Sequence, residues 1–287
     1  MKLEEKTEMI PKTPLYERTL AAMEAAGADT SLLDPRWFEE QPWLVICGGG
    51  HVLKSIVEMA AHMDFRIKVI DDREEFVDPA NYPAAKEVIC DSFENLEKYL
   101  EPDACYIVVT RGHRDDARCV RTILKHSYRY LGMIGSQLKV TKTFENFRRE
   151  GISQEQIDTV FAPIGVDINA VTPPEIAISI LAQVIQVKNS RQSSSASKEL
   201  LYTDKHGILC IIIEKEGSSP RGVGSMMLIT ESEFIDSVGG GNIEYAVIED
   251  AKTCTGVMIR DYNLNNKDSI RLGMICGGSN KVLFIPI

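Results

Sequence analysis

The sequence lacks the marks of a secreted or membrane-spanning protein. Its N-terminal region has neither the basic start nor the apolar core of a signal peptide, and no apolar run approaches the roughly 20 residues that cross a bilayer. Its seven cysteines are scattered and form no CxxC pair, which argues against a zinc site or a disulfide framework. We therefore expect a cytoplasmic protein with reduced thiols.

Basic clusters are also missing. The chain has 32 Lys and Arg residues against 42 Asp and Glu residues, a formal net charge of -10, and it contains no long basic run. Such a surface repels a phosphate backbone, so we expect no nucleic-acid partner. With 287 residues, of which 44% are hydrophobic, the chain is long enough for two domains with separate apolar cores.

Strand-like and helix-like segments alternate between residues 41 and 188. The apolar, strand-like segments are WLVIC at 43–47, FRIKVID at 65–71, EVIC at 87–90, ACYIVVT at 104–110 and YRYLGMIG at 128–135. Helical periodicity fills the intervals at 52–61, 92–100, 115–125 and 138–150. This alternation predicts βαβ units, and therefore an α/β domain with a Rossmann-like parallel sheet over residues 41–188.

The pattern changes on either side of this domain. Residues 1–40 are predicted to form an N-terminal helical segment, with a helix at 13–26. A polar, serine-rich stretch at 189–199 is predicted to be a flexible linker. Beyond it, short β-branched runs separated by glycines, with one helix at 242–251, predict a smaller α+β domain, mostly β, over residues 200–287.

The first candidate site is the glycine motif CGGGHVLKS, which follows the first strand and opens a helix. Gly48 and Gly50 have the GxG spacing that permits a tight turn and lets backbone N–H groups approach an anion. Asp71 and Asp72 end the next strand, about where an acidic residue meets a ribose hydroxyl. The motif predicts a phosphate-bearing ligand, although a tight turn that binds nothing would need the same glycines. His51 either faces that ligand or packs against the turn.

The segment TRGHRDD, at 110–116, follows another buried strand and should reach the same edge of the sheet. Arg111 can grip a phosphate there, and His113 can act as an acid, a base or a ligand, unless both are simply solvated. In the segment APIGVDINAVTPPE, Asp167 and Glu175 are candidate pocket residues, yet turn formation and helix capping explain them as well.

Three glycine motifs mark the smaller domain: GSSPRGVG at 217–224, GGGNIE at 239–244 and CGG at 276–278. Such loops let a backbone approach a ligand closely or form an anion nest, whereas the alternative is an ordinary turn or bulge. The candidate ligand-binding residues in these motifs are Arg221, Gly240, Gly241, Glu244 and Gly277. Cys276 is a candidate soft ligand for sulfur or metal chemistry.

Taken together, these motifs resemble one family. GGGHV, VIDDREEF, TRGHRDD, YLGMIGS and APIGVDINAVTPPEIAISILA are similar to the Rossmann domain of the xanthine dehydrogenase accessory factor (XdhC/CoxI) family, and GSSPRGVGSMML, VGGGNIE and GMICGG to its other domain. The resemblance covers about 43–188 and 200–287. It departs from the family in two respects. The two domains stand in swapped order, and Asn242 occupies a position where the family usually has a cysteine.

The resemblance implies a molybdenum cofactor chaperone rather than a turnover enzyme. Such a protein is expected to hold the pterin cofactor, to permit its terminal sulfuration with a cysteine desulfurase, and to deliver it to a molybdenum hydroxylase. Cys276 would then be the sulfur- or metal-binding group and His113 the second chemical group, with the ligand between the two domains. A homodimer is also expected, because two flexibly joined domains gain from a shared interface.

Two other functions remain open. An oxidoreductase using NAD or NADP would place Asp71 on the ribose and His113 near the chemistry, with Arg73 leaving the choice between the two nucleotides undecided. A nucleotide-sensing regulatory protein would bind its ligand at the same edge without turnover and would dock a partner through the smaller domain.

Overall fold

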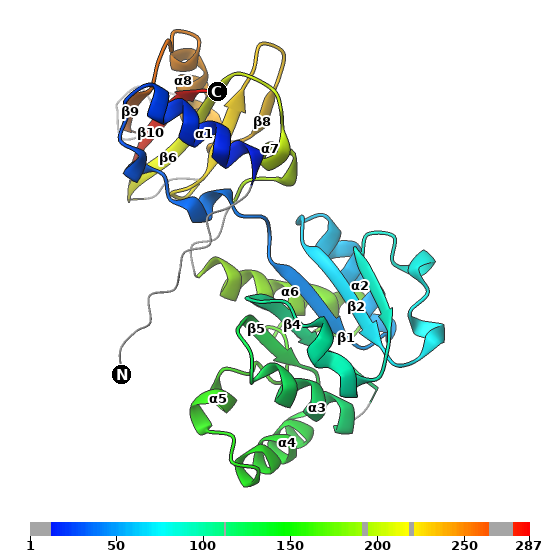
Figure 1. The fold of residues 1–287 in the computed structure, drawn as a ribbon. Helices are drawn as coiled ribbons and strands as arrows, with labels where there is room; N and C mark the ends of the chain where they lie inside the picture. Colours follow the sequence, from blue (N-terminus) through cyan, green and yellow to red (C-terminus); the bar gives the residue numbers. More distant parts are fainter. Residues whose placement is uncertain (1–12, 112, 191–194, 218–220, 264–277) are drawn as a thin grey trace. The chain divides into compact units, whose positions relative to one another are not determined.

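The computed structural model describes residues 13–111, 113–190, 195–217, 221–263 and 278–287, without the side chains of His113 and Asn242. The chain divides into two compact units, which we describe separately (Figure 1). The Rossmann unit is Gln41–Gln192, and the small unit combines Met1–Glu40 with Ser193–Ile287. No helix in the described ranges is both long and apolar enough to span a membrane.

The Rossmann unit contains a five-stranded, wholly parallel sheet in the order β3-β2-β1-β4-β5. Its strands are β1 (Trp43–Cys47), β2 (Arg66–Asp71), β3 (Glu87–Cys90), β4 (Ala104–Val108) and β5 (Tyr128–Met133). The central strands are continuous apolar runs because both faces of the sheet are covered. The predicted Rossmann-like α/β fold is therefore confirmed.

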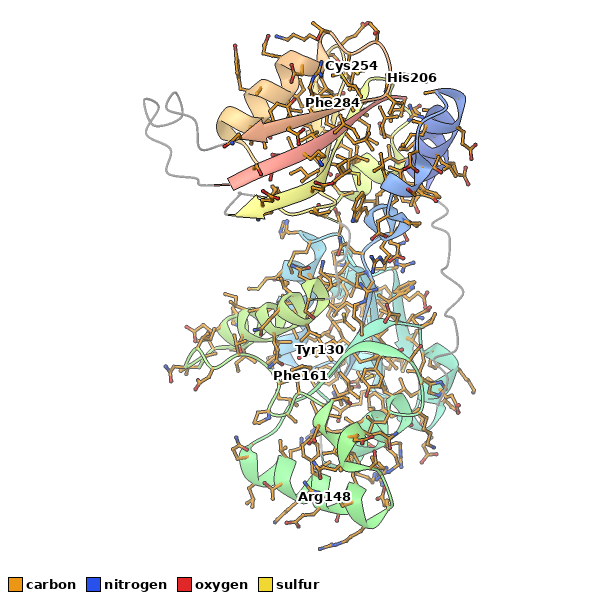
Figure 2. All side chains as sticks on the ribbon, turned by 90° about the vertical axis from the view of Figure 1, so that its left-hand side faces the viewer. Tyr130, Arg148, Phe161, His206, Cys254 and Phe284 are labelled. Atoms are coloured by element: carbon orange, nitrogen blue, oxygen red, sulfur yellow. The ribbon has the colours of Figure 1, made fainter. Side chains whose placement is uncertain are left out.

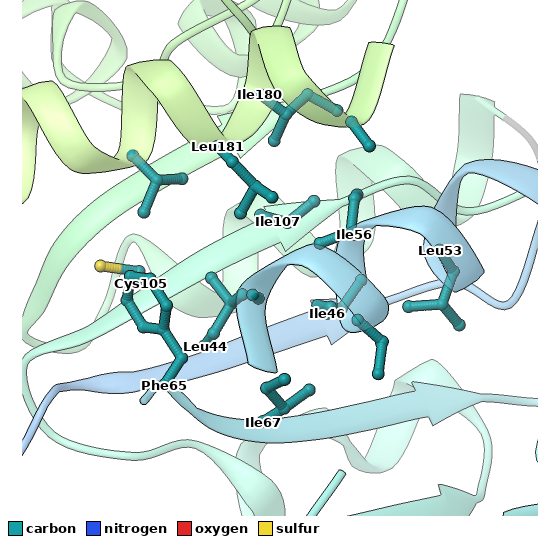
Figure 3. Packing of buried hydrophobic residues seen from close by; sticks show 14 of the residues in the cluster. Leu44, Ile46, Leu53, Ile56, Phe65, Ile67, Cys105, Ile107, Ile180 and Leu181 are labelled. Carbon is teal, nitrogen blue, oxygen red and sulfur yellow. The ribbon is translucent and has the colours of Figure 1, made fainter. Parts of the chain in front are cut away.

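Helices cover both faces of this sheet. The helices are α2 (His51–Ala61), α3 (His113–Ile123), α4 (Gln137–Arg149), α5 (Gln154–Asp158) and α6 (Pro173–Asn189), with short 3-10 turns η3 (Glu74–Phe76), η4 (Pro79–Asn81) and η5 (Phe93–Tyr99). Alternate residues of β1 separate the two cores. Leu44 and Ile46 pack with α2 and α6, as Figure 3 shows, whereas Val45 and Cys47 pack with α3 and α4.

The start of α6 is fixed by a helix cap, one of the two roles that the sequence allows for Glu175. The Glu175 carboxylate accepts from the backbone N–H groups of Val171 and Thr172, at 2.8 and 2.9 Å. Farther along α6, Gln183 accepts a hydrogen bond from Tyr130 on β5, whose ring stacks on Phe161 (Figure 2). These contacts anchor the last helix of the Rossmann unit to the edge of the sheet.

The small unit is built on a five-stranded antiparallel sheet in the order β8-β7-β6-β10-β9. Its strands are β6 (Ile208–Gly217), β7 (Met226–Ile229), β8 (Phe234–Asp236), β9 (Met258–Asn263) and β10 (Gly278–Pro286). One face is covered by α8 (Gly241–Ala251) and the other by α1 (Pro14–Ala25) and α7 (Lys198–Tyr202). The predicted smaller α+β domain is confirmed.

Helix α1 belongs to the core of the small unit, whereas the sequence pattern places it within a separate segment, 1–40. In the structure Leu15 and Met23 are fully buried with Leu209 of β6, and the Arg18 side chain donates to the Thr203 carbonyl at 2.9 Å. Two 3-10 turns follow α1, η1 (Thr30–Leu32) and η2 (Pro35–Phe38). The described part of residues 1–40 thus supplies one wall of a core whose sheet lies more than 150 residues later in the chain.

The predicted linker, 189–199, falls partly on residues 191–194, which lie outside the described ranges. Helix α6 continues to Asn189, and Ala196 is already buried in the core of the small unit. The Ser197 backbone N–H donates to Asp236 at 2.7 Å, and α7 begins one residue later. The chain therefore passes from the last helix of the Rossmann unit into the core of the small unit within a few residues.

Candidate functional site

The candidate site of the Rossmann unit lies where strand order reverses. Strand β1 pairs with β2 on one side and with β4 on the other, so the connections from β1 and β4 leave the sheet in opposite directions. Beyond the strand ends, Gly48 N–H donates to the Ile70 carbonyl and Val109 N–H to the Cys47 carbonyl, both at 2.8 Å. Ligands of open α/β sheets bind at this kind of edge.

The three glycines that follow β1 occupy their positions for different physical reasons. Gly48 has φ +119°, and a Cβ there would lie 2.4 Å from the Val109 carbonyl oxygen. A Cβ on Gly49 would lie 2.4 Å from the Phe76 Cβ. Gly50 has φ −74° and caps α2, and a Cβ there would meet nothing within 4 Å. Gly48 and Gly49 are therefore required for packing, whereas the space beside Gly50 is open at the N-terminus of a helix.

Asp71 fixes this turn from inside the protein. Its side chain is 1% exposed, and its Oδ2 accepts from the Gly49 N–H at 2.5 Å. The Arg73 guanidinium donates to both carboxylate oxygens, at 2.8 and 2.9 Å, and lies over the Phe76 ring. The hydrogen bond that Arg73 donates to Asp71 raises the pKa of Arg73. Asp71, predicted beside a ribose hydroxyl, thus holds the glycine turn. Arg73, which the sequence left undecided between NAD and NADP, positions the Asp71 carboxylate.

Asp72 and His51 are placed differently from Asp71. The Asp72 side chain is 45% exposed, with its carboxylate 3.9 Å from Arg73 Nε, and it remains able to meet a polar ligand. His51 is the first residue of α2 and is exposed. Both predicted residues therefore lie at the mouth of the glycine turn, and Asp72 is the better placed of the two acidic residues to reach a ligand.

The TRGHRDD segment begins directly beside the glycine turn. Thr110 donates through its backbone N–H and its hydroxyl to Asp116 Oδ1, at 3.0 and 2.6 Å, and Lys139 of α4 pairs with Asp116 Oδ2. Burial raises the pKa of Asp116, against the opposing effect of the hydrogen bonds from Lys139 and Thr110. Arg111 is exposed, and His113 is the first residue of α3.

Sequence reasoning missed the Asp116–Lys139 pair. Asp116 stands within the TRGHRDD motif, but its partner lies 23 residues later, at a helix start that carried no signal for a buried charge. The loop before α6 gives a plainer result. Asp167 is exposed, its carboxylate accepts from the Asn169 N–H at 3.4 Å, and Glu175 serves the helix cap described above.

The small unit has a second glycine turn, before α8. Gly239, Gly240 and Gly241 all have positive φ, of 132°, 68° and 64°. The Glu244 carboxylate accepts from the Gly240 N–H at 3.1 Å and from the Ser237 hydroxyl. A residue of the helix's own first turn therefore occupies this turn, and the predicted Gly240, Gly241 and Glu244 do lie together.

The remaining predicted residues of the small unit carry less structural information. Arg221 is exposed. Cys276, the predicted thiol and metal ligand, and Gly277 lie outside the described residues. Within the described ranges, no group of three or more His, Cys, Asp or Glu side chains is arranged to hold a metal ion.

Two models of a single protein family match the chain. The model of the XdhC Rossmann domain matches residues 44–184, and that of the XdhC and CoxI family matches residues 200–258. The first match falls within the Rossmann unit and the second within the small unit. Together they cover more than two thirds of the chain, in the order predicted from the motifs.

Similar proteins include two curated relatives. Uncharacterized protein YqeB of Escherichia coli (strain K12) is 31% identical over 188 residues, which are 64% of this chain and 34% of that protein. A protein of Bacillus subtilis (strain 168) described as a probable subunit of xanthine dehydrogenase is 24% identical over 183 residues, 62% of this chain and 53% of that protein. The chain therefore spans about a third to a half of the length of these relatives.

A crystal structure of a xanthine dehydrogenase from Bacillus halodurans is also similar. It is 29% identical, with a TM-score of 0.48, over 56% of this chain and 47% of that one. The two matched domains, each confirmed by the fold of its unit, decide the assignment: the chain belongs to the XdhC and CoxI family.

Proposed function

We propose that this protein acts in the maturation of a xanthine dehydrogenase-type molybdenum hydroxylase, as a chaperone that binds the molybdenum cofactor and delivers it to the client. Membership of the XdhC and CoxI family supports the proposal, as does a relative described as a probable subunit of xanthine dehydrogenase. The observation that carries it is the open space at Gly50, at the N-terminus of α2 and at the reversal of strand order.

The residues at this edge fit the phosphate end of a pterin cofactor. The first backbone N–H groups of a helix lack partners within the helix and favour an anion. Gly50 leaves room for a phosphate to approach them, and Arg111 provides an exposed cation on the strand end next to Gly48. When bound, the cofactor supplies the metal and dithiolene chemistry, while the Rossmann unit supplies recognition of the phosphate.

The finer parts of the proposal rest on the sequence. Cys276 is the thiol proposed to hold sulfur or metal, because Asn242 stands where the family usually has cysteine. We further propose that a cysteine desulfurase is the partner for sulfuration of the cofactor. The protein is proposed to work in the cytoplasm, as a homodimer. His113, at the start of α3, is proposed as the second group that meets the cofactor.

The experiment is activation of the client in cells. A strain that lacks this protein would be complemented with variants, and the activity of its xanthine dehydrogenase would be measured per amount of enzyme protein. Aspartate and serine both cap helices well, so Gly50→Asp and Gly50→Ser should fold equally well. We expect Gly50→Asp to abolish activation, because its carboxylate repels a phosphate, whereas Gly50→Ser retains a substantial part.

Cys276→Ala is the companion variant, and it should give client enzyme of normal amount but without activity. Normal activation by Cys276→Ala would contradict the role of the thiol. Equal activation by Gly50→Asp and Gly50→Ser would contradict a phosphate at α2. Failure of every variant, together with failure of the unaltered protein to complement the strain, would contradict the maturation role itself.

Binding of NAD or NADP for turnover or sensing is the alternative function. Its support is the Rossmann fold and the exposed carboxylate of Asp72. Against it stands the state of Asp71, whose two oxygens accept hydrogen bonds from Gly49 and Arg73 and are removed from solvent. A ribose contact would therefore fall to Asp72.

A further inference from the structure

A chain of contacts leads from the glycine turn to a buried ion pair. A Cβ at Gly48 would lie 2.8 Å from the Thr110 backbone nitrogen, which itself donates to Asp116. Asp116 pairs in turn with Lys139, in the first turn of α4. Gly48 and Thr110 follow the ends of β1 and β4, and α4 follows β5. The pair thus lies directly behind the edge where the proposed ligand binds.

At the start of α4 an apolar side chain faces solvent and a charged side chain faces the protein interior. Leu138 is 66% exposed, while the neighbouring Lys139 side chain is only 12% exposed and Asp116 is fully buried. Burying an ion pair adds little stability, because desolvation of both charges offsets their attraction. An apolar side chain facing inward at position 139 would serve packing better, so stability alone does not explain a charge at this place.

The two partners differ in how fully they are satisfied. Asp116 accepts from the Thr110 N–H, the Thr110 hydroxyl and Lys139. A lysine ammonium has three donors. Among the described residues, the contacts of Lys139 Nζ give it one acceptor, Asp116 Oδ2, which leaves two donors for an acceptor from outside.

We propose that Lys139 is a ligand-binding residue of the Rossmann unit, donating to the anionic phosphate group, and that Asp116 is the positioning residue that holds its ammonium at the sheet edge. Arg111, by contrast, is exposed. The inference rests on the proposed function only in taking the ligand to carry a phosphate. It assigns recognition of the anion to a cation that the glycine and TRGHRDD motifs do not reveal.

Inorganic pyrophosphate is the probe for the test, titrated by calorimetry into the full-length protein. We expect Lys139→Met to bind pyrophosphate at least about tenfold more weakly, the effect of losing hydrogen bonds to a charged group. Lys142→Met is the matched control, because Lys142 lies on the same helix and is exposed. Its affinity should equal that of the unaltered protein. Equal binding by Lys139→Met, or no binding by the unaltered protein, would overturn the inference.

A second variant separates binding from folding. Lys139→Met alone leaves the Asp116 charge buried without its partner, which destabilises the fold. The double variant Asp116→Asn with Lys139→Met removes both charges, so its thermal stability should recover towards that of the unaltered protein. Its pyrophosphate affinity should stay as low as that of Lys139→Met. Recovery of both properties together would assign the pair a purely structural role.

The result of the pyrophosphate titrations is independent of the proposed maturation role. Pyrophosphate binding through Lys139 in a protein that fails to activate a hydroxylase would refute the proposed function and retain the binding residue. Client activation by a protein whose Lys139→Met variant binds pyrophosphate normally would do the reverse.

Discussion

The two glycine turns of this protein look alike in sequence and are built differently. Each follows a strand, each opens a helix of 11 residues, and in each a carboxylate accepts a glycine N–H. In the Rossmann unit that carboxylate is Asp71, which comes from the neighbouring strand, is buried, and is held by Arg73. In the small unit it is Glu244, from the first turn of the same helix.

This difference indicates which contacts keep each turn rigid. The turn of the Rossmann unit is enclosed on two sides, since a Cβ at Gly48 would clash with Val109 and a Cβ at Gly49 with Phe76. In the small unit, a Cβ at Gly240 would meet nothing within 4 Å. The hydrogen bonds that hold this turn join residues within the eight-residue segment 237–244. We therefore expect the first turn to be a fixed template for an anion and the second to be the more adaptable.

Each unit carries one tryptophan, which makes the comparison measurable. Trp37 lies in the small unit and Trp43 in the Rossmann unit. Urea unfolding followed by fluorescence in a Trp37→Phe background therefore reports on the Rossmann unit, and a Trp43→Phe background reports on the small unit.

The largest effect should come from Gly48→Ala. The positive φ and the contact with the Val109 carbonyl together should lower the free energy of unfolding of the Rossmann unit by about 3 kcal/mol or more. Gly50→Ala is the control, with a loss of about 1 kcal/mol or less, because alanine caps a helix less well than glycine but φ −74° suits it and the space is open. Equal losses from the two variants would refute the division of roles among the glycines.

Asp71→Asn should have the next largest effect. Losing the charge that pairs with Arg73 and receives the Gly49 N–H should cost the Rossmann unit about 2 kcal/mol or more. Glu244→Gln keeps an oxygen acceptor near solvent and should cost the small unit less than about 1 kcal/mol. Urea unfolding curves of the two variants, each in its own tryptophan background, give the two losses of unfolding free energy. A larger loss for Glu244→Gln would contradict the view that the turn of the Rossmann unit depends more on its carboxylate.

Gly240→Ala should cost the small unit about 1–2 kcal/mol, because its φ of 68° and ψ of 176° suit glycine alone, although a Cβ would meet no neighbour there. The measurement is again urea unfolding in the Trp43→Phe background. A loss as large as that from Gly48→Ala would show that the second turn is as tightly packed as the first.

Lys188 should give the stability of the Rossmann unit a dependence on alkaline pH. Burial lowers the pKa of Lys188, whose ammonium donates to Gln41 at 2.9 Å. The folded state then binds fewer protons than the unfolded state, so stability should rise as pH increases from the lowered pKa towards the ordinary value of about 10.4. Lys188→Met should remove that rise, as seen by unfolding at several alkaline pH values. An unchanged pH dependence would contradict the burial effect.

Much of the fold followed from local patterns. Apolar runs such as 43–47 and 104–110 predicted buried parallel strands, and helix capping was one of the roles predicted for Glu175, at the start of α6. These signals are local, because a strand or a cap is decided by neighbouring residues. The place of α1 was not predictable in the same way, since its apolar side needs strands that come nearly 200 residues later.

The candidate site was less predictable for a related reason. The spacing of Gly48, Gly50 and Asp71 is the same whether the acidic residue meets a ribose or holds the turn. In the structure Arg73, two residues later, pairs with Asp71, which also accepts from the Gly49 N–H. The partnership of Asp116 and Lys139 depends on the packing of α4 against the edge of the sheet, which no spacing rule contains.

The most direct measurement is the pterin content of the protein itself. The chain would be purified without oxygen from a host that makes molybdenum cofactor, oxidised, and assayed for released fluorescent pterin, with NAD and NADP titrated into the same preparation. The maturation role predicts stoichiometric pterin with negligible nicotinamide nucleotide binding, and a loss of that pterin in Gly50→Asp. Absence of pterin together with micromolar binding of NAD or NADP would contradict it.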